Sequence, residues 1–136
     1  MFYHGSPVKL STLVPSKSPL LDGSQVVFAT PVKNLAVLFS RRWSGTEFKL
    51  SIDNGVLYLE ELSEGVFDQI FLNQRGYIHY VDHKHFVKDK RLGMYHHEFI
   101  SLRKEQVLHV EEVGNLGQYI IESERIELIP FSKKRD

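Results

Sequence analysis

Cysteine is absent from this chain of 136 residues. Without a thiol, the protein forms no disulfide, no thiolate nucleophile and no cysteine-ligated zinc site. A charge excess is missing as well, because seventeen Lys and Arg residues balance seventeen Asp and Glu residues. Proteins that bind nucleic-acid backbones normally carry a basic excess, so we expect no broad nucleic-acid binding.

A long apolar run is also missing. Hydrophobic residues make up 42% of the chain and charged residues 25%, as in ordinary globular proteins, and no apolar stretch approaches membrane-spanning length. The opening residues Met1-Phe2-Tyr3-His4 lack the basic and apolar segments of a secretion signal. Together with the absence of cysteine, this favours a cytoplasmic protein that does not enter a membrane.

The length of the chain fits one domain, because two domains would each be too short to bury a good core. We therefore expect a single domain over residues 1–131, followed by a frayed charged tail at residues 132–136.

Short β-rich runs between turn residues predict many strands. The predicted strands cover residues 2–5, 25–29, 48–52, 56–60, 77–81, 97–102, 107–113 and 125–130. Asp53-Asn54-Gly55 predicts a hairpin turn, because Asn-Gly tolerates positive φ at both central positions. Residues 9–22 and 82–93 are polar and irregular, which predicts two loops, the first anchored to the core by its leucines.

Three short helices are predicted among these strands. Thr30-Pro31 is a typical helix start, because Thr caps exposed N–H groups and Pro fits the first helical position. The helices are expected from there to residues 41–43, over residues 63–71 with Gly76 closing the end, and over residues 115–122. Strands outnumber helices and do not alternate regularly with them, which predicts an α+β fold rather than a doubly wound sheet.

The first motif that can carry chemistry is Tyr3-His4-Gly5-Ser6, at the end of the first predicted strand. It places an imidazole beside a glycine, where a ligand can approach the main chain and pair with its N–H and C=O groups. Taken alone, the motif is more readily explained as a strand end with a turn glycine and an incidental histidine.

The second motif is His97-Glu98-Phe99-Ile100-Ser101. Strand alternation sends Glu98 and Ile100 to one face and Phe99 to the other. A carboxylate beside apolar positions lies either at the rim of a sheet or in a cleft where its charge is used. Taken alone, an exposed Glu paired with a nearby Lys or Arg is the better interpretation.

Together with the strand Val27-Phe28-Ala29-Thr30, which leads into a helix, these motifs resemble the ADP-ribosyltransferases. The closest likeness is to the branch of poly-ADP-ribose polymerase and diphtheria toxin. There one strand ends in His-Gly-Thr or His-Gly-Ser, and a second ends in Tyr-Phe-Ala and runs into a helix. A later strand carries a catalytic Glu within Asn-Glu-Tyr-Ile or a close variant. The three motifs stand in the same order in this chain, and the resemblance covers most of its length.

The resemblance implies an ADP-ribosyltransferase-like split antiparallel sheet with two or three short helices, NAD as the substrate and no metal. It implies that His4 hydrogen-bonds the adenosine ribose, and that the Gly5 backbone holds the nicotinamide carboxamide with support from Ser6. Glu98 would hydrogen-bond the nicotinamide ribose. Cleavage of the nicotinamide glycosidic bond develops an oxocarbenium-like cation, which a fixed carboxylate stabilises in the transition state. The implied activity is mono-ADP-ribosyl transfer to a protein, nucleic acid or small molecule.

Two aromatic positions of that branch are changed here. Val27 stands where the family has the tyrosine before Phe-Ala, and Leu38 aligns with the helix tyrosine that stacks on nicotinamide. Phe28, Phe39 and Trp43 are the aromatic residues that remain to contact NAD. The arginine-specific toxin branch fits poorly, because the chain has no Ser-Thr-Ser strand and no Glu-x-Glu pair around the candidate glutamate.

Two other groups of residues have competing interpretations. Asp82, His83 and His85 offer metal-ligating side chains, but their spacing matches no known ligand pattern, and solvated loop histidines are the better interpretation. Arg41 and Arg42 suit a pyrophosphate, whereas basic residues at a helix C-terminus also simply stabilise the helix.

Three functional classes therefore remain open. The first is an NAD-dependent ADP-ribosyltransferase whose acceptor no motif identifies. The second is a non-catalytic relative that binds NAD or another nucleotide through His4 and Gly5, and the third is a protein-interaction domain that keeps the fold. Only the transferase is expected to lose turnover when Glu98 is replaced, and only a nucleotide binder or the transferase loses its ligand when His4 is replaced.

Overall fold

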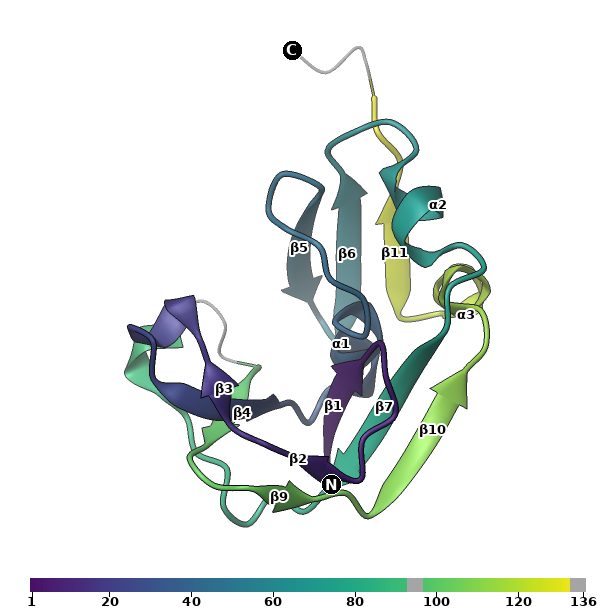
Figure 1. The fold of residues 1–136 in the computed structure, drawn as a ribbon. Coiled ribbons are helices and arrows are strands. Elements are labelled where there is room, and N and C mark those ends of the chain that lie inside the picture. Colours follow the sequence, from purple (N-terminus) through teal and green to yellow (C-terminus); the bar gives the residue numbers. More distant parts are fainter. Residues whose placement is uncertain (93–96, 133–136) are drawn as a thin grey trace.

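The computed structural model describes residues 1–92 and 97–132, which form a mixed α+β structure (Figure 1). The strands are β1 (Phe2–Ser6), β2 (Thr12–Leu13), β3 (Ser16–Lys17), β4 (Gln25–Ala29), β5 (Phe48–Asp53), β6 (Val56–Glu61), β7 (Gly76–Val81), β8 (Phe99–Ser101), β9 (Glu105–Gln106), β10 (His109–Val113) and β11 (Ile126–Ile129). The helices are α1 (Lys33–Leu38), α2 (Val66–Phe71) and α3 (Leu116–Glu122), with 3-10 turns η1 (Pro19–Leu21) and η2 (Lys90–Leu92). Helices this short depend on packing against the sheets for their stability.

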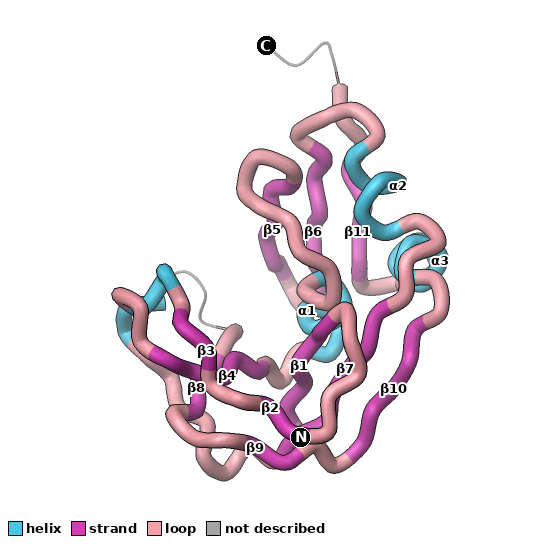
Figure 2. The backbone as a smooth tube through the Cα atoms, viewed as in Figure 1, coloured by secondary structure: helices cyan, strands magenta, loops and turns pink. Residues whose placement is uncertain are grey.

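The described strands form four small sheets, and antiparallel pairing dominates. The sheets β1–β7–β10, β3–β4–β8 and β2–β9 are antiparallel, whereas β11–β6–β5 joins an antiparallel hairpin to the parallel strand β11. Figure 2 shows β3, β4 and β8 at the lower left, β5, β6 and β11 at the top, and β1 and β7 between them. The α+β class predicted from the sequence is confirmed at this level.

The sheets β1–β7–β10 and β3–β4–β8 meet where β1 lies beside the end of β4, and the split between β1 and β4 begins there. Tyr3 and Thr30 exchange two backbone hydrogen bonds of 2.8 and 2.9 Å, and this isolated bridge is the point of contact between the two strands. Beyond it the sheet β3–β4–β8 turns away from β1 (Figure 1). The end of β1 that follows Tyr3 is therefore paired with β7 on one side only.

The main hydrophobic core lies between β6, β7 and the three helices. Its fully buried side chains include Leu38, Phe48, Leu57, Leu59, Phe71, Ile78, Leu116 and Ile120. A smaller cluster lies where β2, β4 and β7 approach one another, and it contains Leu13, Val27, Ala29, Val81 and Phe86. Strand β7 contributes to both clusters, with Ile78 in the first and Val81 in the second, so it joins the two packed regions of the described chain.

The hairpin predicted at Asp53-Asn54-Gly55 is confirmed. Asn54 has a φ of 50° and Gly55 a φ of 76°, which is the pair of positive values that a two-residue hairpin turn requires. The turn sets the register of β5 against β6, in which Leu50 pairs with Leu59.

The predicted start of the first helix is wrong by two residues, about half a turn. Helix α1 begins at Lys33 after Val32, and it ends at Leu38 rather than near residues 41–43. Thr30 does not cap the helix because its backbone N–H and C=O are held by Tyr3, which keeps the residue in the sheet. Its hydroxyl instead accepts a 3.0 Å hydrogen bond from the Val32 N–H and closes a turn before the helix.

The predicted role of Gly76 is also wrong. Helix α2 begins after Gly65 and ends at Phe71, and Asn73 takes the left-handed conformation (φ 59°) that commonly follows a helix. Gly76 is the first residue of β7, where a Cβ atom would lie 2.5 Å from the Ser40 hydroxyl oxygen. Glycine is required at this position because β7 packs closely against Ser40, which follows α1.

The two predicted loops contain more structure than the sequence indicated. Residues 9–22 form β2, β3 and η1, and the expected leucine anchors are found at Leu13 and Leu21, which are both buried. The loop after β7 ends in η2, which lies against η1.

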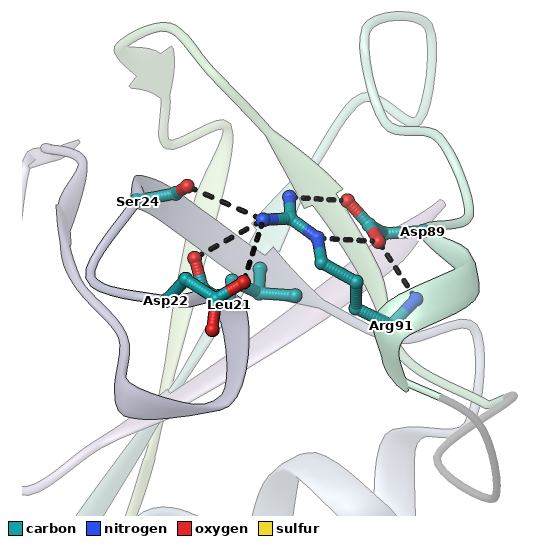
Figure 3. A network of polar contacts seen from close by, with 5 residues as sticks. All are labelled: Leu21, Asp22, Ser24, Asp89 and Arg91. Carbon is teal, nitrogen blue, oxygen red and sulfur yellow. Dashed lines mark hydrogen bonds and ion pairs between the residues drawn. The ribbon is translucent and has the colours of Figure 1, made fainter.

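Arg91 joins these two turns through its guanidinium group, as Figure 3 shows. It forms a 2.7 Å ion pair with Asp89 and a hydrogen bond of 3.2 Å to the Leu21 carbonyl oxygen, and it approaches Asp22 at 4.0 Å. The ion pair with Arg91 lowers the pKa of Asp89 to about 2. Arg91, part of the predicted charged loop, is therefore occupied by contacts within the protein.

The C-terminal strand β11 ends at Ile129, and residues 133–136 of the predicted tail lie outside the described residues. In the described part of the chain, no helix combines the length and the apolar character needed to cross a membrane.

Candidate functional site

A cavity of about 830 Å³ opens at the split between β1 and β4. This volume is typical of sites for cofactors and other small molecules. The cavity is lined by Tyr3, His4, Gly5, Phe28, Ala29, Thr30, Leu35, Ala36, Phe39, Trp43, Gly45, Phe48, Lys49, Leu50, Ser51, Ile52, His97 and Glu98. It brings together six of the seven residues that the sequence assigned to the candidate site, from segments that are distant along the chain.

Strand pairing explains how the two motifs come together. In β8, Phe99 pairs with Ala29 of β4 in antiparallel register. The residue before Phe99 therefore lies beside Thr30, which is bridged to Tyr3 of β1. Thr30 thus lies between Glu98 on one side and Tyr3 of β1 on the other, which brings Glu98 close to β1. The sequence placed Glu98 inside a strand over residues 97–102, whereas β8 begins one residue later, at Phe99.

His4 is held as a neutral imidazole with a defined tautomer. Its Nδ1 lies 2.7 Å from the Phe28 carbonyl oxygen, and a carbonyl only accepts, so Nδ1 carries the proton. Burial lowers the pKa of His4, and the neighbouring His79 lowers it further, against the opposing effect of the Phe28 hydrogen bond. Nε2 is left as a hydrogen-bond acceptor for a ligand in the cavity.

His79 supports His4 from the neighbouring strand β7. The Leu10 N–H donates a 2.9 Å hydrogen bond to His79 Nε2, so Nδ1 carries the proton and donates to the His4 carbonyl oxygen at 3.1 Å. His79 is fully buried, and this burial lowers the pKa of its imidazole. Both ring nitrogens are used within the protein, so His79 has a structural role.

The main chain at Gly5 presents an open donor and acceptor. Tyr3 exchanges its backbone hydrogen bonds with Thr30, and the Leu108 N–H donates to the Tyr80 carbonyl oxygen, so Tyr3 and Tyr80 face away from each other in their β1–β7 pair. Backbone direction alternates along an antiparallel strand, and Gly5 therefore turns its N–H and C=O the same way as Tyr3. β4 has turned away from β1 at this point, so the N–H and C=O of Gly5 face the cavity instead of a neighbouring strand.

The missing side chain at Gly5 has a packing reason of its own. A Cβ atom at this position would collide with the carbonyl oxygen of Ala36 in helix α1. Gly5 therefore allows α1 to lie directly on β1, and this close packing brings Leu35, Ala36 and Phe39 to the wall of the cavity. The absence of a side chain at Gly5, predicted to let a ligand approach the main chain, is therefore also required for the packing of α1.

Glu98 is the acidic residue of the cavity wall and is partly buried. Within residues 1–92 and 97–132 the structure gives its carboxyl group no hydrogen bond and no ion pair. Burial disfavours the charged form and raises the pKa of Glu98 to about 7. A carboxyl group in this position is ready to respond to a positive charge that appears in the cavity.

Aromatic side chains form another part of the wall. The rings of Phe39 and Trp43 stack with centroids 5.7 Å apart, and the Trp43 Nε1 donates a 2.8 Å hydrogen bond to the Leu38 carbonyl oxygen. Phe28 lines the cavity from β4. Leu38, which aligns with the family's stacking tyrosine, is fully buried in the main core and does not line the cavity.

Strand β5 contributes a wall that the sequence did not indicate. The five consecutive residues from Phe48 to Ile52 line the cavity. Side chains of a strand alternate between its faces, so consecutive lining residues mean that the cavity meets the edge of β5. The hairpin turn was visible in the sequence, but nothing in it showed which edge of the hairpin would face the site.

Two groups considered from the sequence lie elsewhere. Ser6 is buried and its hydroxyl accepts a 3.2 Å hydrogen bond from the Val8 N–H, so it belongs to the turn after β1 rather than to the cavity wall. Arg41 and Arg42 line a different cavity. In the described residues no three His, Asp or Glu side chains gather at distances suited to a metal ion.

Comparisons of this chain with protein-family models, curated proteins and solved structures found no match. The function is therefore argued from the cavity and from the motifs that it brings together.

Proposed function

We propose that this protein is an NAD-dependent mono-ADP-ribosyltransferase with an ADP-ribosyltransferase-like split sheet. The observation that supports the proposal is the cavity at the split, which unites His4, the Gly5 backbone and Glu98 although 93 positions separate Gly5 from Glu98 in the chain. The three groups suit three parts of NAD, and their chemistry is compatible with cleavage of its nicotinamide bond.

Nicotinamide recognition is assigned to the Gly5 backbone. A carboxamide has one acceptor oxygen and a donor NH₂ group, which match the N–H and C=O that Gly5 turns toward the cavity. The pyridinium ring would then lie near the aromatic part of the wall formed by Phe39 and Trp43, where a flat cationic ring gains from contact with π faces. These residues would replace the nicotinamide-stacking tyrosine of the ADP-ribosyltransferases, whose position is occupied by Leu38 in this chain.

Ribose recognition is assigned to His4. The neutral ring keeps Nε2 as an acceptor, and the hydroxyls of the adenosine ribose are suitable donors. Because His4 is held through Nδ1 by the Phe28 carbonyl, its acceptor has a fixed position before NAD binds. A preorganised acceptor of this kind loses little side-chain entropy on binding.

Glu98 is assigned the catalytic role. The bond between C1′ of the ribose and the pyridinium nitrogen breaks, and its electron pair leaves with nicotinamide. The positive charge moves onto the ribose as an oxocarbenium-like cation, which the ionised Glu98 carboxylate stabilises. The acceptor nucleophile then forms a bond to C1′, and the carboxylate takes the proton that the nucleophile releases.

The experiment measures NAD binding by calorimetry and nicotinamide release by chromatography on the same preparations. Wild type is compared with His4→Ala, Glu98→Gln and the control Glu124→Gln, which removes an exposed carboxylate outside the cavity. Circular dichroism verifies that each variant is folded.

The proposal expects saturable binding that weakens about tenfold in His4→Ala, in keeping with the loss of one buried hydrogen bond. Nicotinamide release is expected to fall about 100-fold or more in Glu98→Gln while affinity stays within about threefold. Release that survives in Glu98→Gln contradicts the catalytic assignment. Binding without release from wild type favours the non-catalytic nucleotide binder, and no binding at millimolar NAD excludes both.

A further inference from the structure

A second cavity, of about 320 Å³, lies between the turn after β1, the chain that follows α1, and helix α2. It is lined by Pro7, Arg41, Arg42, Gln69, Ile70 and Gln74. The chain from residue 39 to residue 43 separates this cavity from the larger one. Phe39 and Trp43 line the larger cavity, while Arg41 and Arg42 line the smaller one.

Arg41 is fixed in this wall with part of its guanidinium unused. Its Nη2 donates a 2.7 Å hydrogen bond to the Arg75 carbonyl oxygen, which holds the side chain in place. Of the buried side-chain nitrogen and oxygen atoms in residues 1–92 and 97–132, Arg41 Nε alone has no hydrogen-bond partner. Nε itself is buried within the wall, so the donors that Arg41 can offer to a ligand are Nη1 and the second N–H of Nη2.

The charge of the wall has one sign. Its polar side chains are two guanidinium groups and two carboxamides, and none of the described carboxylates lines it. The ion pairs among the described residues include neither Arg41 nor Arg42. The neighbouring Glu112 is 3.7 Å from the Arg75 guanidinium and is more than half exposed, so it does not neutralise this wall from inside.

The donors suit a tetrahedral oxyanion. A guanidinium group offers parallel N–H donors whose spacing matches two oxygens of a phosphate group, and two such groups with added amide N–H donors can serve three or four oxygens. The volume is at the small end of ligand sites and accommodates a phosphate with a small substituent but not a dinucleotide.

We propose that the cavity lined by Arg41, Arg42, Gln69 and Gln74 binds a phosphate group, either inorganic phosphate or the phosphate of a small monoester. The Nη groups of Arg41, which the Arg75 carbonyl oxygen holds in place, and the exposed guanidinium of Arg42 supply the charged donors. The site is separate from the cavity assigned to NAD, and it binds its ligand without NAD.

Calorimetric titration of the NAD-free protein with inorganic phosphate tests this site, with sodium chloride holding the ionic strength constant. A parallel titration uses glycerol 3-phosphate. The variants are Arg42→Gln, Arg41→Gln and the control Arg103→Gln, which removes an exposed arginine outside the cavity. Arg42→Gln carries the test if Arg41→Gln fails to fold, because its side chain is exposed.

The expected result is saturable binding that weakens about tenfold in each cavity variant and is unchanged in Arg103→Gln, since each lost guanidinium removes charge-assisted hydrogen bonds. Tighter binding of glycerol 3-phosphate than of phosphate supports the site and assigns it a monoester, and the reverse supports it and assigns the free anion. Absence of saturation at millimolar phosphate, or equal weakening in Arg103→Gln, overturns the proposal. None of these results depends on NAD, so the two proposals fail independently.

Discussion

His4 and Glu98 line the same cavity, but the protein holds them in opposite ways. The imidazole of His4 donates to the Phe28 carbonyl, and its backbone accepts from His79, so both its parts are tied to neighbours. The carboxyl group of Glu98 has no hydrogen bond or ion pair in the described residues. Burial shifts the pKa of each group toward its neutral form, down for His4 and up for Glu98.

This difference separates recognition from chemistry. A tied neutral imidazole offers the same acceptor over the whole range above its lowered pKa, which suits ligand binding. An untied carboxyl group with a pKa of about 7 changes its charge near neutral pH, which suits a group that must stabilise a cation or take a proton. Four predictions test the contrast, in order of decreasing effect.

The pH dependence of nicotinamide release gives the largest expected effect. Only ionised Glu98 stabilises the developing cation, and its pKa is raised to about 7, so the rate is expected to rise about 100-fold from about pH 5 to about pH 8. Release of nicotinamide is measured across this range at NAD concentrations well below saturation, where the rate depends on the pKa of the ligand-free protein. The residual rate of Glu98→Gln is expected to stay level, and a wild-type rate that is equally level contradicts the assignment.

The stability of Glu98→Gln tests the same carboxyl group without any ligand. Because the folded state raises the pKa from 4.5 to about 7, it favours the protonated form. The resulting stabilisation is complete below about pH 4.5 and is lost as the pH rises through about 7. Relative to wild type, Glu98→Gln is expected to gain about 3 kcal/mol in free energy of unfolding between about pH 4 and about pH 8.

Urea unfolding at the two pH values measures this gain. Glu124→Gln serves as the control, because Glu124 is exposed. A gain shared by both variants would mean that general charge, and not burial of Glu98, is responsible.

Gly5→Ala tests the close packing of β1 on α1. The added methyl group meets the Ala36 carbonyl oxygen, a backbone atom that cannot move aside as a side chain can. The expected loss is about 3 kcal/mol in free energy of unfolding, the upper range for overpacking. Gly45→Ala is the matched control, because no atom lies within 4 Å of a Cβ built there, and it is expected to change stability by about 0.5 kcal/mol or less. Equal losses in both variants would contradict the packing argument.

The smallest effect is expected from His4 in acid. Its pKa is lowered by burial, so the unfolded state binds the proton more readily, and stability is lost as the pH falls below the ordinary value of 6.5. His4→Gln keeps a donor for the Phe28 carbonyl but cannot titrate. Its stability is expected to fall less steeply than wild type below about pH 6.5, by at most about 1.4 kcal/mol per pH unit. Chemical unfolding between about pH 5 and pH 7 measures the two slopes, with exposed His109→Gln expected to follow wild type.

The sequence predicted the strands well where local signals agree. The run over residues 25–29 is β4 without change, and the Asn54-Gly55 turn joins β5 and β6 as expected. The helix predicted over residues 115–122 is α3, and Asn115 caps it by accepting from the Gln118 N–H. In each case the deciding interaction lies within a few residues along the chain.

The errors occurred where distant segments compete for the same backbone. Thr30 is a residue type that commonly caps helices, but its backbone N–H and C=O pair with Tyr3 and keep it in the sheet. Glycine is common just after helices, but Gly76 is the first residue of β7 and packs against Ser40. The β5 wall of the cavity and the separation of Arg41 from Phe39 were equally invisible, because they depend on packing between segments far apart in the chain.

The sequence by itself determined which chemical groups the protein has: the His4-Gly5 strand end, the Glu98 motif, the balanced charge and the absence of cysteine. Local propensity also determined most of the strands, because turn residues and alternating burial act over short distances. Only the tertiary structure decided that β1, β4 and β8 meet at Thr30, that Glu98 is partly buried with no hydrogen bond or ion pair among the described residues, and that two arginines face a separate cavity. Those outcomes depend on strand register and burial, which arise when the whole chain packs and are not encoded in any short stretch of it.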